Sequence, residues 1–136
     1  MKRDLFLCIA VLVLLGFSLD VSASGPVRVE VLAMNHPPMQ PVIRQLKDLF
    51  SKYGEKIAVS WYDVDTREGQ QLMAIKGLTG HVPLVIWIQG SNTAKTGQKS
   101  VTFAGFPSGS GPEPFEGEWT MRDLSSALDQ TISSRR

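Results

Sequence analysis

The chain has little cysteine: a single one, Cys8, among its 136 residues. One thiol excludes an intrachain disulfide, a four-thiolate zinc site and an iron–sulfur cluster held by this chain alone. An excess of charge of either sign is also lacking, since 14 Lys and Arg stand against 13 Asp and Glu, a formal net charge of +1. A chain so close to neutral has no strong attraction to nucleic acid or to an anionic membrane surface. We therefore expect neither as a partner.

Long apolar runs are confined to the N-terminus, where the segment from Leu5 to Phe17 carries no charge. It follows a short basic start and precedes Val21-Ser22-Ala23, a small-residue cleavage pattern. The run is shorter than the roughly 20 residues that a membrane span needs. We predict a secretory signal peptide over residues 1–23 and a periplasmic or otherwise extracytoplasmic domain over residues 24–136, with no stable membrane anchor after cleavage. An uncleaved anchor is the alternative.

The predicted cleavage removes Cys8, so the exported domain would contain no thiol. A thiolate is required for thiol–disulfide exchange, for a cysteine nucleophile and for thiolate metal ligation. The sequence also shows no phosphate-binding glycine loop before a helix and no arrangement of Ser, His and Asp that stands out. We therefore expect a protein that is not an enzyme and has no cofactor.

Hydrophobic periodicity predicts an α/β domain with the order β-α-β-α-β-β-α. Period-two or apolar runs predict strands at residues 27–33, 57–64, 83–88 and 101–104. Helical spacing predicts helices at residues 42–53, at 65–76 and from 120 onward. Helices between the first three strands favour parallel crossovers, and the short last connection favours an antiparallel pair. The prediction is one four-stranded mixed sheet with helices on both faces.

The order of elements, with Pro83 opening the third strand after a Gly-containing connector, resembles the thioredoxin fold, a three-layer sandwich. The resemblance covers nearly all of residues 24–136. It aligns His36 and Met39 with the two cysteines of the family's CxxC motif, so that HPPM stands where thioredoxins have their redox pair. It also aligns Glu30 with the buried acid of the family, and Tyr53 and Asp65 with a tyrosine and an aspartate near the site. The resemblance implies the site geometry without the redox chemistry.

The resemblance further implies that the Val82–Pro83 bond is cis and that Val82 offers backbone groups to an extended peptide. A surface formed by His36, Met39, Val82 and Pro83 would then bind a protein or peptide partner. In the alternative interpretation, this proline only fixes a turn. The leading hypothesis is thus an exported, redox-inactive thioredoxin-like accessory or binding protein.

A second hypothesis concerns copper. His36 and His81 are the only histidines, and both fall beside the expected site, with Met39 and Met34 nearby in sequence. Imidazole and thioether together suit copper, especially Cu(I). His36, Met39 and His81 are therefore candidate ligands of a copper-binding or copper-delivery protein. Side chains alternate in an extended segment, so His81 could equally face away from His36.

Other residues leave alternatives open. Glu30 could orient an imidazole or pair with Arg28 on the surface. Trp61 and Trp87 are expected to be core or half-buried strand residues, and Trp119 to pack ahead of the last helix. The Gly- and Pro-rich loop from Gly105 to Glu118 could be a partner-binding flap or a plain surface linker.

Overall fold

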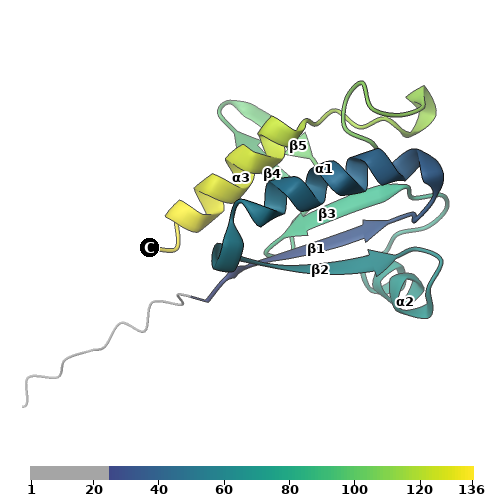
Figure 1. Cartoon of the computed structure of the whole chain (residues 1–136), viewed down its shortest axis with the longest axis horizontal. Coiled ribbons are helices and arrows are strands. Elements are labelled where there is room, and N and C mark those ends of the chain that lie inside the picture. Colours follow the sequence, from purple (N-terminus) through teal and green to yellow (C-terminus); the bar gives the residue numbers. More distant parts are fainter. Residues whose placement is uncertain (1–24) are drawn as a thin grey trace, which may run out of the picture.

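The computed structural model of the chain describes residues 25–136, and the predicted signal peptide lies outside the described residues (Figure 1). Within the described part, no helix is both long and apolar enough to cross a membrane. The described residues form a mixed α/β structure with one three-stranded sheet and one separate two-stranded sheet.

The three-stranded sheet has the order β2-β1-β3, so the first strand of the chain lies in the middle. Its members are β1 (Val27–Ala33), β2 (Ile57–Asp63) and β3 (Leu84–Ile88). β1 pairs in parallel with β2 along their whole length, and antiparallel with β3. The sheet is therefore mixed, as predicted, and β2 forms one of its edges.

The direction of β3 differs from the prediction, which had the first three strands parallel. The helix α2 (Arg67–Ile75) has only nine residues, a length of about 14 Å. It lies across the strands at the carboxyl ends of β1 and β2 rather than running back along them (Figure 1). The chain therefore enters β3 at the same end, where Leu84 pairs with Ala33, and must run antiparallel to β1.

Helices cover both faces of this sheet. The helices α1 (Gln40–Ser51) and α3 (Met121–Ser133) pack on one face, and α2 packs on the other (Figure 1). The alternating side chains of β1 enter two separate hydrophobic clusters, with Val29 and Val31 beneath α1 and α3, and Leu32 beside Leu72 of α2. Five of the seven residues of β1 are buried because both faces of the sheet are covered, while Arg28 is exposed and Glu30 is half-buried.

The expected fourth strand at residues 101–104 does not form a full strand of this sheet. Lys99–Thr102 forms β5, which pairs antiparallel with β4 (Thr93–Thr96) in a hairpin that turns at Gly97. The chain then passes along β3 through a single antiparallel bridge between Val85 and Ala104. The Ile86 amide donates to the Phe103 carbonyl at 3.0 Å and the Gly105 amide donates to Leu84 at 2.8 Å. The prediction missed β4 because its alternation is polar and half-exposed.

Local capping signals are confirmed at both later helices. The Thr66 side chain accepts a hydrogen bond from the Gly69 amide at the start of α2, and Gly77 takes a left-handed conformation just after its end. Thr120 and Asp123 form a reciprocal capping box at the start of α3. Two single 3-10 turns, at Gly54–Lys56 and Glu113–Phe115, occupy connections.

The three tryptophans have different environments. Trp87 is 4% exposed and Trp119 is 0% exposed, as the sequence predicted. Trp119 packs edge-on against Phe103 and donates a hydrogen bond to the Gly105 carbonyl at 3.1 Å. Trp61 is instead 38% exposed, because it lies on β2 at the edge of the sheet. The prediction that Trp61 is a core or half-buried residue is wrong for this reason.

Candidate functional site

A small pocket lies at the carboxyl end of β1 and has a volume of about 180 Å³. Three segments that are distant in sequence form it: the start of the α1 region, the connection before β3, and the loop after β5. Its walls are Met34, His36, Pro38, Met39, His81, Pro83, Phe106, Pro112 and Phe115. We call it the HPPM pocket. It brings together His36, Met39, His81 and Pro83, four of the five residues that the sequence singled out, and Val82 lines a shallow hollow that adjoins it.

The HPPM segment forms a tight turn at the entrance of the first helix. His36 precedes the 3-10 turn η1 (Pro37–Met39), and the Met39 amide donates to the His36 carbonyl at 2.9 Å. Two prolines fit here because the first helical amides have no intrahelical partner. The turn leaves His36 exposed and places Met39, only 1% exposed, in the core cluster beneath α1. Met39 therefore forms the floor of the pocket and His36 its rim.

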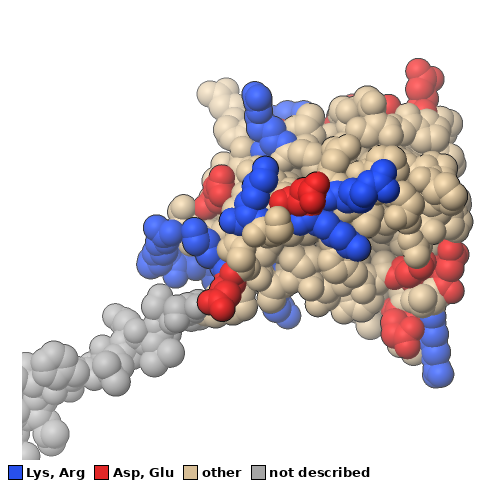
Figure 2. All heavy atoms as spheres, in the orientation of Figure 1, with Lys and Arg blue, Asp and Glu red and all other residues tan. Residues whose placement is uncertain are grey.

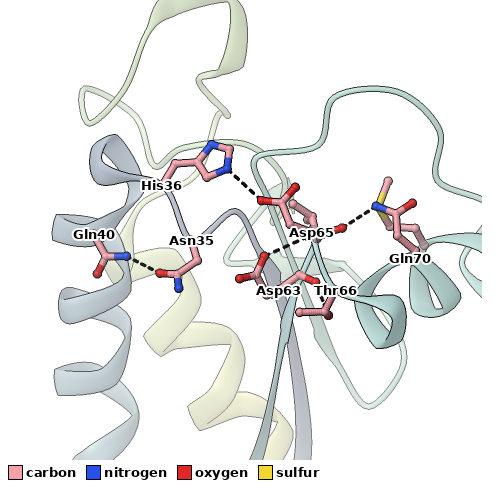
Figure 3. Close-up of polar contacts among 9 residues, drawn as sticks. Asn35, His36, Gln40, Asp63, Asp65, Thr66 and Gln70 are labelled. Atoms are coloured by element: carbon pink, nitrogen blue, oxygen red, sulfur yellow. Dashed lines mark hydrogen bonds and ion pairs between the residues drawn. The ribbon is translucent and has the colours of Figure 1, made fainter.

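The imidazole of His36 is held by a carboxylate from another part of the chain. His36 Nε2 lies 2.9 Å from Asp65 Oδ2, which belongs to the turn between β2 and α2 (Figure 3). Asp63 Oδ1 accepts a hydrogen bond from the Asp65 amide at 3.0 Å and so fixes this turn. Both side chains are more than half exposed, so the pair orients the imidazole and adds little to stability.

The position of Asp65 opposite His36 follows from the parallel pairing of β1 and β2. Ala33 pairs with Asp63, so the segments after both strands emerge at the same edge of the sheet. The resemblance to thioredoxins aligned both residues with the site of that family but did not predict their contact. Gln40 reinforces the His36 side of this edge by donating a hydrogen bond to the Asn35 side chain (Figure 3).

The segment before β3 supplies the opposite wall. The Met34 amide donates to the Pro83 carbonyl at 2.9 Å, which ties Pro83 to the end of β1. The His81 ring lies 4.8 Å from the Phe115 ring, between centroids, and both rings line the pocket. His81 therefore faces the same pocket as His36. Within residues 25–136, the backbone groups of His81 and Val82 take part in no hydrogen bond.

The Val82–Pro83 bond is trans, as is every peptide bond within the described residues. The cis bond expected from the resemblance is therefore wrong. The trans form is the lower-energy form of a peptide bond before proline by about 0.5–1 kcal/mol. With this trans bond, the Pro83 carbonyl still accepts the hydrogen bond from the Met34 amide, and the chain still enters β3 at Leu84.

The loop from Gly105 to Glu118 folds back on itself against the pocket. The Phe106 amide donates to Phe115 at 2.8 Å, and the Gly117 amide donates to Phe106 at 2.7 Å. Gly105 and Gly117 allow this approach, because a Cβ at either position would overlap backbone across the loop. The doubled loop presents Phe106, Pro112 and Phe115 to the pocket. The glycines, prolines and aromatic residues of the loop are visible in the sequence. Its position beside the HPPM segment could not be predicted from them.

Glu30 has a partner that neither sequence interpretation named. Its Oε2 atom accepts a hydrogen bond from Lys76 Nζ at 3.0 Å, and the same Nζ lies 4.9 Å from the centroid of the Trp87 ring. Lys76 follows α2 directly, so the pair links the end of this helix to the sheet. Glu30 therefore does not pair with Arg28 and does not orient an imidazole.

Three comparisons, with models of protein families, with curated proteins and with solved structures, found no match to this chain.

Proposed function

We propose that this protein is an exported, redox-inactive member of the thioredoxin-like superfamily that binds an extended segment of a partner protein at the HPPM pocket. The observation that carries the proposal is the convergence of His36, Met39, His81 and Pro83 on one apolar pocket. These residues occupy the positions that the resemblance assigns to the redox motif and its facing proline. The absence of cysteine from residues 24–136 leaves binding, and not thiol exchange, as the use of such a site.

The topology of the described part supports the thioredoxin-like assignment. A parallel β-α-β unit leads through a short crosswise helix to an antiparallel strand, and the chain from Phe103 to Gly105 then runs beside that strand. A final helix packs beside α1 on one face. The last pairing is a single bridge between Val85 and Ala104 rather than a full fourth strand, because the hairpin of β4 and β5 diverts the chain.

The pocket has the size and chemistry for a side chain of a partner. Its volume of about 180 Å³ is below the roughly 300–1,000 Å³ of sites for drug-sized ligands. Its walls are mostly proline, methionine and aromatic side chains, which favour an apolar occupant. Beside it, the unbonded backbone groups of His81 and Val82 can pair with an extended peptide. Main-chain pairing would supply affinity, and the pocket would select one side chain.

Selection from a random peptide library tests this proposal. We expect the selected peptides to share one apolar anchor residue and to shift the amide NMR signals of Met39, His81 and Val82. Phe115→Ala removes one wall of the pocket and should weaken binding at least tenfold. Ile75→Ala is the matched control, since Ile75 is 79% exposed on α2 and lies outside the pocket. Equal peptide affinity in the wild type and Phe115→Ala would contradict the proposal.

Copper binding is the second candidate function, and one specific observation favours it. Both imidazoles and the side chains of Met34 and Met39 line the same pocket. His36 Nε2 faces the Asp65 carboxylate, which leaves Nδ1 for a metal (Figure 3). A carboxylate behind the distal nitrogen is the usual support of a metal-binding histidine. Among the described residues, no group of three or more His, Cys, Asp and Glu side chains could hold an ion, so thioethers would have to complete the site.

Competition against a chromophoric Cu(I) chelator separates the two candidates. If copper binds, His36→Ala and His81→Ala should each lower the Cu(I) affinity at least tenfold, and Asp65→Asn should lower it by about 10–100-fold. Met121→Ala, a methionine outside the pocket, is the control. Equal Cu(I) affinity in the wild type and His36→Ala would end the copper proposal and leave the peptide proposal standing.

A further inference from the structure

The charges of this chain are unevenly distributed over the described residues, although its 14 Lys and Arg and 13 Asp and Glu nearly cancel. The segments at the HPPM pocket are residues 34–40, 63–68, 78–83 and 105–118, and together they contain six acidic residues and one basic residue, Arg67. In Figure 2, acidic side chains predominate at the end of the molecule where β1 and β2 finish, whereas basic side chains predominate over α1 and at the opposite end. The pocket therefore lies in the acidic part of the molecule.

Two of these carboxylates border the pocket on different sides. Asp65 Oδ2 lies 2.9 Å from Nε2 of His36, which forms the rim. Glu116 lines the adjoining hollow together with Val82. The Glu116 carboxylate accepts a hydrogen bond from the Gly109 amide, which fixes its position. The pocket thus has one carboxylate on the side of the α2 turn and another on the side of the loop after β5.

These carboxylates have no Lys or Arg partner within residues 25–136. Of the two ion pairs there, one joins Lys76 to Glu30 and the other uses the imidazole of His36. No Lys or Arg forms an ion pair with Glu116 or with Glu113, which is exposed in the same loop. Carboxylates at one end of a molecule without counter-charges create a field that attracts cations.

Two basic side chains near this end do not change its character. Arg67 is exposed in the first turn of α2 and forms no ion pair with an acidic residue of the described part. Lys99 Nζ contacts the backbone carbonyl of Glu118 at 3.3 Å, so it offsets the charge of that residue. The remaining acidic residues leave an excess of negative charge around the pocket.

We propose that the segment that binds at the HPPM pocket is cationic: an extended stretch of a partner protein with one apolar anchor residue and with Lys or Arg on both sides of it. This inference rests on the proposed function and specifies the class of partner. The anchor occupies the apolar pocket, and the backbone of the segment lies along His81 and Val82. Alternate residues of an extended chain are about 7 Å apart, so long basic side chains beside the anchor can reach Asp65 in one direction and Glu116 in the other.

The same charges disfavour other segments. An acidic segment would bring like charges together at the rim of the pocket, which is costly, and a neutral one would gain nothing from the field. Exposed charges at the rim of a binding site act mainly on specificity and on the rate of association. Salt screens them over about 10 Å at 0.1 M. We therefore expect a preference for cationic segments that weakens as the salt concentration rises.

Three fluorescent peptide libraries test this proposal. Each contains short peptides with an equal mixture of Phe, Leu and Met at the central position. The libraries differ only in the flanking residues, which are Lys and Arg, Ser and Gln, or Asp and Glu. Fluorescence anisotropy measures their affinity for the purified protein at about 20 mM and about 0.5 M NaCl. At low salt we expect the cationic library to bind about tenfold more tightly than the neutral one, and at high salt we expect most of this advantage to disappear.

A pair of charge variants locates the effect. Glu113→Gln with Glu116→Gln removes two carboxylates beside the pocket, and the glutamine oxygen can still accept the hydrogen bond from the Gly109 amide. This variant should bind the cationic library about five- to tenfold more weakly and the neutral library unchanged. Asp48→Asn with Glu55→Gln is the matched control, since it removes the same charge from exposed positions outside the pocket. It should bind like the wild type, and circular dichroism checks that both variants are folded.

The possible failures are distinguishable. Equal affinity for the three libraries, with Phe115→Ala still weakening all of them, would overturn this inference and leave the proposed function standing. An equal loss of cationic binding in the two charge variants would also overturn it, because the net charge rather than the pocket would then select the peptide. Cationic binding that Phe115→Ala leaves unchanged, or no binding of any library, would overturn the proposed function as well.

Discussion

The environment of His36 depends on the local turn, on the register of two strands and on the direction of a third. Its place before two prolines and a methionine is a property of the sequence, and those prolines set the turn that exposes it and buries Met39. Its contact with Asp65 depends on the parallel register of β1 and β2. Its position across a pocket from His81 depends on the antiparallel entry of β3.

The HPPM turn leads to a prediction about engineered cysteines. The hydrogen bond from the Met39 amide to the His36 carbonyl defines a turn of four residues, in which the end Cα atoms lie within about 7 Å. A disulfide can span this separation. In a Cys8→Ser background, His36→Cys with Met39→Cys should therefore lose both free thiols on mild oxidation, as measured by a thiol-reactive dye, and stay monomeric on a non-reducing gel.

The single variant His36→Cys in the same background is the control, and it should keep one thiol under the same mild oxidation. Two thiols that stay free in the double variant would contradict the turn geometry. They would also count against the alignment of HPPM with the thioredoxin motif.

At the scale of the element, the short helix α2 decides the direction of the chain. It is held against the end of β2 by Gly69, where a Cβ would overlap the backbone carbonyl of Asp63. The Thr66 cap and the left-handed Gly77 set its two ends. The close contact at Gly69 keeps α2 across the sheet, and this orientation brings His81 and Pro83 back to the edge where His36 lies.

Gly69→Ala tests this contact. Alanine has a better helix propensity than glycine by about 1 kcal/mol, so propensity alone predicts stabilisation. We expect instead a loss of about 1–3 kcal/mol in the free energy of unfolding, because the added Cβ forces α2 away from β2. Urea unfolding measures this change. Gln71→Ala, on the exposed side of the same helix, should change it by less than about 0.5 kcal/mol. A Gly69→Ala protein as stable as the wild type would contradict the close packing.

A hydrogen bond joins the end of α1 to α3. The Tyr53 hydroxyl donates to the Ser125 carbonyl at 3.1 Å and lies 2.9 Å from Ser125 Oγ. Burial raises the pKa of Tyr53 above its usual value of about 10, and the nearby Asp129 also raises it, while the Ser125 side chain acts in the opposite direction. The folded state thus favours the neutral phenol more than the unfolded chain does.

This shift predicts alkaline destabilisation. The unfolded tyrosine ionises first, so Tyr53 contributes stability that is fully present below pH 10 and is lost as the pH rises through the pKa of the folded state. We expect the free energy of unfolding to fall above pH 10 and to fall less steeply in Tyr53→Phe. Urea titrations from pH 8 to 11 measure both slopes, with Tyr62→Phe as the control. Identical slopes for the wild type and Tyr53→Phe would be inconsistent with this role.

At the scale of the whole molecule, the proposed function depends on export of the protein and on removal of its signal peptide. We expect the protein outside the cytoplasm and beginning at Ser24, because the run from Leu5 to Phe17 and the small residues after it match a cleaved leader. Cell fractionation followed by mass spectrometry of the intact protein measures both properties.

Two leader variants sharpen this test. Ala23→Leu removes the small residue before the cut and should leave the precursor uncleaved. Ser22→Leu, at the middle position where the side chain is not restricted, should be processed normally. An intact Met1 on the wild-type protein, embedded in the membrane, would show that the segment is an anchor.

Most of the elements could be predicted from the sequence because their signals are local. Alternation in β1, the capping residues Thr66, Thr120 and Asp123, and the left-handed Gly77 each act within a few residues. The hairpin strand β4 was missed because polar, half-exposed residues give no hydrophobic pattern. The direction of β3 was mispredicted because a nine-residue helix does not by itself show whether it crosses the sheet or runs back along it.

The sequence by itself determined the chemistry that this protein can offer: histidine, methionine and proline at one helix entrance, and no thiol after Cys8. It also determined that residues 27–33 form a strand, since apolar and polar residues alternate from Val27 to Val31. Only the tertiary structure decided that Asp65 holds His36, that the loop with Phe106 and Phe115 closes the pocket, and that β2 is left as an open edge. Strand order and register bring these residues together, and both depend on contacts between segments far apart in the chain.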